Sequence, residues 1–146
     1  MPYPNPVYIA ATVMTSILVF FLYRNLSSQK KLFVVFDAIG LGVFTLIGAH
    51  TAYTLFGTDL LLIVIGGLLT PIGGGIIRDV LVNEHPLVFT KEIYAAASFL
   101  GIVTFCIFIL THVNFEVAAI ITILLVIVVR LLAVKYNWNL PTVRTS

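Results

Sequence analysis

The chain is 146 residues long, and 60% of its residues are hydrophobic while only 10% are charged. Soluble domains carry roughly 25% charged residues, so this composition, with a mean hydropathy of +1.13, excludes an ordinary soluble domain and favours a membrane protein. The net charge of +2 reflects membrane topology rather than binding to nucleic acid. The single cysteine, Cys106, excludes an internal disulfide framework and is interpreted as a small buried hydrophobe.

Five apolar segments predict five membrane-spanning helices, each close to the roughly 17 to 25 residues that cross a bilayer. In chain order they cover residues 7–23, 32–56, 60–82, 93–110 and 117–133. The connections are short, so we expect an all-α polytopic bundle that forms a single transmembrane domain over residues 1–146. The first segment does not resemble a signal peptide, because its basic residues follow the apolar run instead of preceding it.

The basic residues indicate how the chain crosses the membrane. If the N-terminus lies outside, all eight lysines and arginines fall on the inner side: Arg24, Lys30, Lys31, Arg78, Lys91, Arg130, Lys135 and Arg144. The outer connections carry Asp59, His112 and Glu116 instead. Because positive residues are retained on the inner side, we expect the N-terminus outside and the C-terminus in the cytoplasm.

Small residues form two stripes along the predicted helix 32–56. On a helix of about 3.6 residues per turn, the stripes lie roughly 120° apart. One stripe holds Asp37, Gly40, Phe44, Gly48 and Thr51, and the other holds Ala38, Gly42, Thr45, Ala49 and Ala52. Small side chains let helix backbones approach each other in lipid, so we expect this helix to contact neighbours on two sides, inside the bundle.

The segment 60–82 contains a helix breaker at membrane depth. The breaker consists of Pro71 followed by Gly73, Gly74 and Gly75. It predicts a division into an outer half over 60–69 and an inner half that begins near Ile76. Carbonyl groups of Thr70 and the glycines would then suit a cation, whereas the N–H groups of the inner half would suit an anion. The alternative is a packing kink where another helix crosses closely.

Three charged side chains lie at the inner side of this predicted gap, and each has a structural as well as a functional interpretation. Arg78 either snorkels to the inner surface or limits cation occupancy electrostatically. Asp79 either pairs with a neighbouring base, or caps a half-helix, or contacts the ion. Asp37 either forms an ion pair near the inner surface or faces the pore.

Two polar residues farther out on helix 32–56, Thr45 and His50, are possible members of the same pathway. A lone histidine is usually a hydrogen-bonded structural residue, and the alternative for His50 is a proton relay. Tyr94 and Trp138 are expected at the membrane interfaces.

An internal similarity suggests a repeat. The stretch 8–12, YIAAT, resembles the stretch 94–98, YAAAS, although the two helices would enter the membrane from opposite sides. Opposite orientation of related helices is typical of inverted repeats in transport proteins.

Six motifs carry a resemblance to a known family. They are DAIGL at 37–41, GGGIIRDVL at 73–81, HPLVF at 85–89, YA at 94–95, RLLA at 130–133 and WNLP at 138–141. Together they closely resemble the prokaryotic relatives of trimeric intracellular cation (TRIC) channels, also described as a glycine-transporter-domain (UPF0126) family. The resemblance implies a 3+3+1 fold with two inverted triplets of helices, a pore within each protomer, a homotrimer and conduction of monovalent cations, chiefly potassium.

On this family pattern the chain corresponds to the last five helices. Residues 1–31 would be the third helix of an incomplete first repeat with its loop, 32–112 the second repeat, and 113–146 the final helix with a cytoplasmic tail. The first two helices, one of them a glycine-kinked pore helix, would be absent. The family implies a multi-pass protein of the bacterial or archaeal cell membrane.

The sequence thus predicts an ion pathway lined by Asp37, Thr70, Gly73, Gly74, Gly75, Arg78 and Asp79. Three functions stay open: a potassium channel subunit, a secondary transporter of glycine or another small solute, and an incomplete subunit without a working pore. Enzyme motifs are missing, and His50, His85 and His112 lack the spacing of metal ligands. We therefore expect no catalytic residues, no metal and no cofactor.

Overall fold

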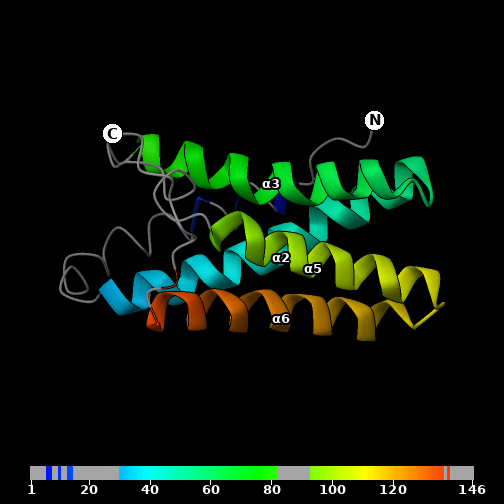
Figure 1. Ribbon diagram of the computed structural model, residues 1–146. Coiled ribbons are helices and arrows are strands. Elements are labelled where there is room, and N and C mark those ends of the chain that lie inside the picture. The colour runs from blue at the N-terminus through cyan, green and yellow to red at the C-terminus, as the bar shows by residue number, and fades with distance from the viewer. Residues whose placement is uncertain are drawn as a thin grey trace, which may run out of the picture. The chain divides into compact units, whose positions relative to one another are not determined.

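The computed structural model describes residues 6–7, 10, 13–14, 30–81, 93–136 and 138. The chain divides into two compact units, Met1–Phe33 and Val34–Ser146, and the fold described below is that of the second. Its helices are α2 (Lys30–Phe56), which enters this unit at Val34, α3 (Leu60–Leu81), α5 (Ile93–Leu110) and α6 (Phe115–Lys135). In Figure 1 the colours of α2 and α5 run in the opposite direction to those of α3 and α6, so successive helices are antiparallel.

Each of these four helices is long and apolar enough to cross a membrane, with hydropathy values of 1.8, 2.3, 2.4 and 3.0 in chain order. The four predicted segments from residue 32 onward are therefore confirmed as helices, and their bounds differ from the observed ones by at most two residues. The first predicted span, 7–23, lies outside the described residues except at positions 7, 10, 13 and 14. The described residues 30–81 and 93–136 therefore form an all-α bundle with the length and composition of a multi-pass membrane protein.

The α2–α3 and α5–α6 turns are short, and the helix ends beside them are capped locally. Gly57 ends α2 with a φ of 67°, and its N–H donates to the carbonyl of Tyr53 at 2.9 Å. Asp59 begins α3, since its Oδ1 accepts the N–H groups of Leu61 and Leu62 at 3.1 and 3.3 Å. Asn114 begins α6 in the same way, by accepting the N–H of Glu116 at 2.8 Å.

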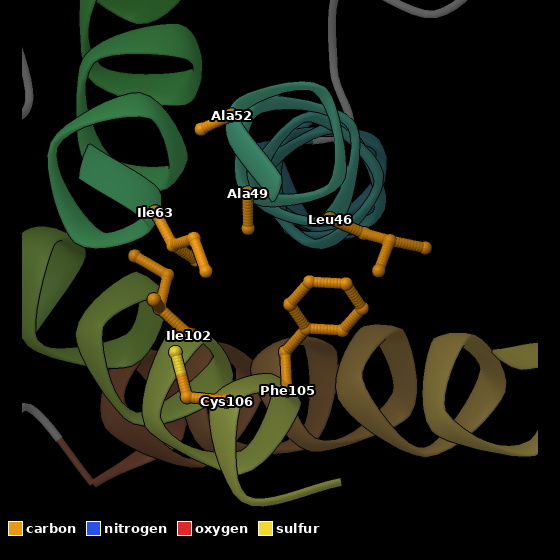
Figure 2. Close-up of a cluster of buried hydrophobic side chains, with 7 residues drawn as sticks. All are labelled: Leu46, Ala49, Ala52, Ile63, Ile102, Phe105 and Cys106. Atoms are coloured by element: carbon orange, nitrogen blue, oxygen red, sulfur yellow. The ribbon is translucent and has the colours of Figure 1, made fainter. Parts of the chain in front are cut away.

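The main core lies between α2, α3 and α5. Figure 2 shows side chains of the three helices pointing into one space: Leu46, Ala49, Ala52, Ile63, Ile102, Phe105 and Cys106. Cys106 is a free cysteine with only 8% of its surface exposed, so its interpretation as a small buried hydrophobe is confirmed. A second buried cluster joins Leu41, Tyr94, Ala97 and Val126.

Close helix crossings explain the small residues of α2. At Gly48 the backbone of α2 touches the carbonyl of Gly66 in α3, and at Gly42 it lies against Ile123 of α6. The prediction that this helix has neighbours on two sides is therefore confirmed. The stripe from Ala38 to Ala52 is buried throughout, whereas the stripe that starts at Asp37 is not, since its members Phe44 and Thr51 are exposed.

The predicted division of the third span into two half-helices is wrong. Helix α3 continues from Leu60 to Leu81 with Pro71 inside it. Proline removes one backbone donor, and a fixed φ near −65° is itself helical, so the rest of the hydrogen-bond ladder can continue past it. Glycine also adopts helical dihedral angles, at a cost of about 1 kcal/mol relative to alanine. The proline ring adds about 3 kcal/mol, and the helix persists because packing against its neighbours and the cost of unpaired backbone groups in an apolar medium outweigh the sum.

Candidate functional site

Four ionised side chains meet at the end of the bundle where α2 begins and α3 and α6 finish. We call Asp37, Arg78, Asp79 and Arg130 the charged cluster. Arg78 lies between the two carboxylates: its NH1 group donates to Asp37 Oδ1 at 2.5 Å, and its Nε donates to Asp79 Oδ1 at 2.8 Å. On the other side of Asp37, the NH2 group of Arg130 lies 3.5 Å from Oδ2. The Asp37 carboxylate therefore links three helices.

The side chains of the charged cluster are largely buried, so their ion pairs are needed to stabilise the charges. The side chains of Asp37, Asp79 and Arg130 are only 2%, 5% and 3% exposed, whereas that of Arg78 is 32% exposed. A charge at membrane depth costs several kcal/mol unless it is paired or hydrated. Two carboxylates and two guanidinium groups cancel, so the four side chains together carry no net charge. The prediction that Asp37 forms an ion pair is confirmed, and so is the pairing of Asp79 with a neighbouring base.

Tyr94 joins the charged cluster to the glycine run. The guanidinium carbon of Arg130 lies 4.9 Å from the centroid of the Tyr94 ring, within the range of a cation–π contact. The hydroxyl group of Tyr94 lies beside Gly75, where an added Cβ would be 2.9 Å from it. Tyr94 is 3% exposed and packs inside the bundle, and its predicted place at a membrane interface stays a prediction. Trp138 is 52% exposed and stacks on Tyr136, with ring centroids 6.0 Å apart.

The sequence pattern indicates Arg130 only as an inner-side basic residue, and its contact with Asp37 becomes evident in the structure. A signal was present, because Arg130 is the one charge within the predicted span 117–133. An arginine in that position has to find a partner, which here is Asp37. Tyr94 gave a weaker signal, because an aromatic residue near a helix start fits an interface equally well.

The three glycines of α3 have different surroundings. Gly75 packs on Tyr94, whereas a Cβ built at Gly73 or Gly74 would meet no atom of the described residues within 4 Å. Thr70 is exposed, and its hydroxyl donates to the carbonyl of Gly66 at 2.9 Å. Thr70 also lies against Gly48 of α2. The predicted pathway residues of α3 thus fall into an open group, Thr70, Gly73 and Gly74, and a packed residue, Gly75.

The two possible pathway residues farther along α2 lie apart from the charged cluster. The Thr45 hydroxyl is fully buried, donates to the carbonyl of Leu41 at 2.7 Å and lies 3.1 Å from the Ser98 hydroxyl oxygen. His50 packs on Phe115 with ring centroids 4.4 Å apart. At about 1.5 Å per residue, His50 is about 20 Å along the helix from Asp37. A role for either residue in the pathway stays a prediction.

The described residues contain no group of three or more His, Cys, Asp and Glu side chains that could hold a metal ion. The chemistry available at the charged cluster is therefore that of carboxylates and guanidinium groups: binding and exchanging single charges.

Known proteins with the same sequence pattern are membrane proteins. The family described as "Glycine transporter" matches residues 34–110. The UPF0126 inner membrane protein YadS of Escherichia coli is 34% identical over 140 residues, which cover 94% of this chain and 67% of YadS. The UPF0126 membrane protein YvgT of Bacillus subtilis is 34% identical over 130 residues, which cover 88% of this chain and 62% of YvgT.

Solved structures of the same fold are TRIC cation channels. One of them has a TM-score of 0.84 and 35% identity, and the match covers 100% of this chain and 73% of that one. The trimeric intracellular cation channel orthologue from Rhodobacter sphaeroides has a TM-score of 0.84 and 25% identity, covering 92% and 69%. The chain thus spans about two thirds of the length of these relatives, and it belongs to the UPF0126 family, which shares its fold with the prokaryotic TRIC channels.

Proposed function

We propose that this chain is a subunit of a channel for monovalent cations, chiefly potassium, that works as a homotrimer in a prokaryotic cell membrane. The observation that carries the proposal is the buried charged cluster next to an open, small-residue face of α3. Similarity to three solved TRIC channels supports it. These relatives are named as channels or membrane proteins and not as enzymes, which supports a role without catalysis.

The open face of α3 is our candidate for the pathway wall. Only 17% of the most apolar stretch of α3 is buried, against 44% for α2. Thr70, Gly74 and Arg78 recur every four residues, so they lie on one side of the helix. On that side Gly73 and Gly74 leave open space as far as the described residues go, and Thr70 is exposed as a residue while its hydroxyl lies against Gly48 of α2. A surface that faced only lipid would have no need of a hydroxyl and a guanidinium group on the same side.

The charged cluster would act at one end of this pathway. Because its carboxylates are buried and already near Arg78, small movements of Arg78 change the charge that a passing ion meets. The one-sided distribution of basic residues supports an orientation with the N-terminus outside and the charged cluster near the cytoplasm.

The second candidate is a secondary transporter of glycine or another small solute, which the description of the matching family favours. In that case Arg78 would bind the carboxylate of the solute, since guanidinium groups suit carboxylates. Under the channel proposal many ions pass at each opening and no solute is needed. Under the transporter proposal transport is saturable, depends on solute and yields no unitary currents.

One experiment separates the two. The purified chain is reconstituted into planar bilayers with potassium chloride on both sides, and into vesicles for counterflow of labelled glycine. We expect voltage-driven unitary potassium currents and no glycine counterflow. Protein-free membranes and the chain with Asp59→Asn, a change at the opposite end, serve as controls. Saturable glycine counterflow without unitary currents would contradict the channel proposal, and the absence of both would contradict both candidates.

A further inference from the structure

The end of the bundle opposite the charged cluster carries a pocket that the proposed function does not use. The pocket has a volume of about 230 Å³ and lies where α5 turns into α6 (Figure 1). Pockets for drug-sized ligands have volumes of roughly 300–1,000 Å³, so this one suits a smaller molecule. We propose that this pocket, which we call the aromatic pocket, binds the quaternary ammonium group of a small soluble cation. The proposal goes beyond the channel function and does not depend on it.

Aromatic rings from three helices line the aromatic pocket. Tyr53 comes from α2, Phe105 from α5 and Phe115 from α6. The rings of Phe105 and Phe115 have centroids 6.5 Å apart and planes inclined at 82°, so they form two sides of a corner. The His50 ring packs on Phe115 and also contacts Tyr53 and Phe105, which keeps the three rings in place. Several rings around one space are the arrangement by which proteins recognise quaternary ammonium groups.

The aromatic pocket has a buried floor and an exposed rim. Phe105 and Ala118 line it with 0% and 2% of their surfaces exposed, whereas Val113 and Phe115 are 37% and 47% exposed. A ligand that enters past the rim therefore meets buried aromatic surface and leaves water behind, which strengthens a cation–π contact.

The backbone of the α5–α6 turn builds the rim. His112 has a φ of 55°, in the left-handed region that residues with a side chain seldom adopt. Its N–H donates to the carbonyl of Ile109 at 3.1 Å, and the N–H of Val113 donates to the carbonyl of Phe108 at 3.0 Å. This tight turn places His112 and Val113 at the pocket, beyond the last residue of α5. The rim thus belongs to a connection and not to an apolar helix face, so we assign the pocket to a ligand from solution.

The charges around the aromatic pocket favour a cation. Glu116 follows Phe115 directly, Asp59 lies in the α2–α3 turn at the same end, and both are exposed. The sequence has no lysine or arginine in residues 32–77 or 92–129. Helices α2 and α5 both end here, and the carbonyl groups at the end of a helix carry partial negative charge. At the start of α6, Asn114 already accepts the N–H of Glu116.

The chemistry of the lining distinguishes a quaternary ammonium group from a metal cation. Rings and aliphatic side chains provide most of the surface, and the Tyr53 hydroxyl and the His112 ring are its polar side-chain groups. An alkali cation would lose its hydration shell here without gaining the oxygen ligands that replace it. A quaternary ammonium group is covered by methyl groups, so it fits an apolar wall while its charge is attracted to the ring faces.

The first test measures binding of choline to the whole chain in a maltoside detergent, by saturation transfer from the protein to the choline methyl protons at constant ionic strength. The uncharged carbon analogue of choline, in which a quaternary carbon replaces the nitrogen, has the same shape and reports in the same way. We expect choline to half-saturate the site at a concentration about tenfold lower than the analogue does, because only choline gains the cation–π term. Equal affinities for the two compounds would overturn the proposal.

The second test locates the site by substitution. Phe115→Leu keeps an apolar side chain but removes a ring, so we expect the half-saturating choline concentration to rise about tenfold. Phe99→Leu is the matched control, since Phe99 is also 47% exposed and lies on α5 outside the pocket lining, and it should leave choline binding unchanged. Equal choline affinity in Phe115→Leu and the unsubstituted chain would contradict the proposal.

Two further measurements use the unsubstituted chain, so they do not depend on whether a variant folds. Nuclear Overhauser contacts are expected between the choline methyl protons and the ring protons of labelled phenylalanine and tyrosine, and their absence would refute the site. Choline binding is also compared in nanodiscs of phosphatidylglycerol and of phosphatidylcholine, and we expect the same affinity in both. Loss of choline binding in phosphatidylcholine alone would assign the pocket to a lipid headgroup and overturn the assignment to a soluble ligand.

Discussion

The two ends of the helix bundle are held together by different kinds of contact. At one end the charged cluster ties α2, α3 and α6 through a few directional ion pairs. At the other end His50, Tyr53, Phe105 and Phe115, which we call the aromatic end, pack ring against ring at centroid distances of 4.4 to 6.5 Å. Buried ion pairs depend on one another, because losing one leaves the other charges without partners. Ring contacts are individually weak, so a substitution at one of them costs less stability. The comparison therefore predicts that substitutions destabilise the fold more at the charged end than at the aromatic end.

The largest expected effect comes from removing the shared carboxylate. Asp37→Asn leaves Arg130 buried without a counter-charge, and breaking a buried pair in this way typically costs about 3–5 kcal/mol. We expect a loss of that size in the free energy of unfolding, measured with denaturant in detergent. The control is Asp59→Asn at the other end, where asparagine caps α3 about as well as aspartate does. Equal losses in the free energy of unfolding for the two substitutions would show that the charged end is no more sensitive to substitution than the α2–α3 turn.

A smaller difference in stability is expected between alanine substitutions at Gly75 and Gly74, the two glycines that precede the charged cluster. Gly75→Ala places a methyl group against the Tyr94 hydroxyl, which displaces the ring that supports Arg130, so we expect a loss of about 1–2 kcal/mol. Gly74→Ala meets open space and should stabilise the helix by about 0.5–1 kcal/mol through helix propensity. Thermal unfolding of the two variants side by side measures the difference. A loss of stability in Gly74→Ala as large as that in Gly75→Ala would mean that the open face of α3 is occupied.

The smallest effect is expected at the aromatic end. His50→Phe keeps a flat ring against Phe115 and Phe105, so the free energy of unfolding should change by less than about 1 kcal/mol. Potassium conductance should also be unchanged, and it should keep the same dependence on external pH. A large change in that pH dependence would restore the proton-relay interpretation of His50 and weaken the contrast between the two ends.

The sequence predicted the helices well because hydropathy over about 20 residues is a local property. The bounds of α5 agreed fully, and of the two small-residue stripes that helical spacing predicted on α2, the one from Ala38 to Ala52 is buried throughout. Asp37 and Arg78 could be proposed as partners because both fall near the same membrane surface. Their contact with Arg130 could not, because it depends on how α6 crosses α2.

Two features that the sequence pattern did not predict share one physical origin. The continuity of α3 past Pro71 and the burial of Tyr94 both depend on packing between helices that are distant in sequence. A proline–glycine run lowers the local preference for helix, but tertiary contacts such as the crossing of Gly48 with Gly66 outweigh it. Tyr94 is buried because Arg130 and Gly75 provide a polar and a close-packed partner for one ring. Neither partner is evident from the sequence around residue 94.

The pairing of Asp37 with Arg78 is the central claim, and a double-mutant cycle tests it most directly. The free energy of unfolding is measured in detergent for the unsubstituted chain, Asp37→Asn, Arg78→Gln and the double variant. The structure predicts a coupling energy of about 1–3 kcal/mol, because the two side chains are in contact. The double variant should therefore be more stable than the sum of the single losses implies. Additive losses within about 0.5 kcal/mol would contradict the pairing, and with it the role given to Arg78.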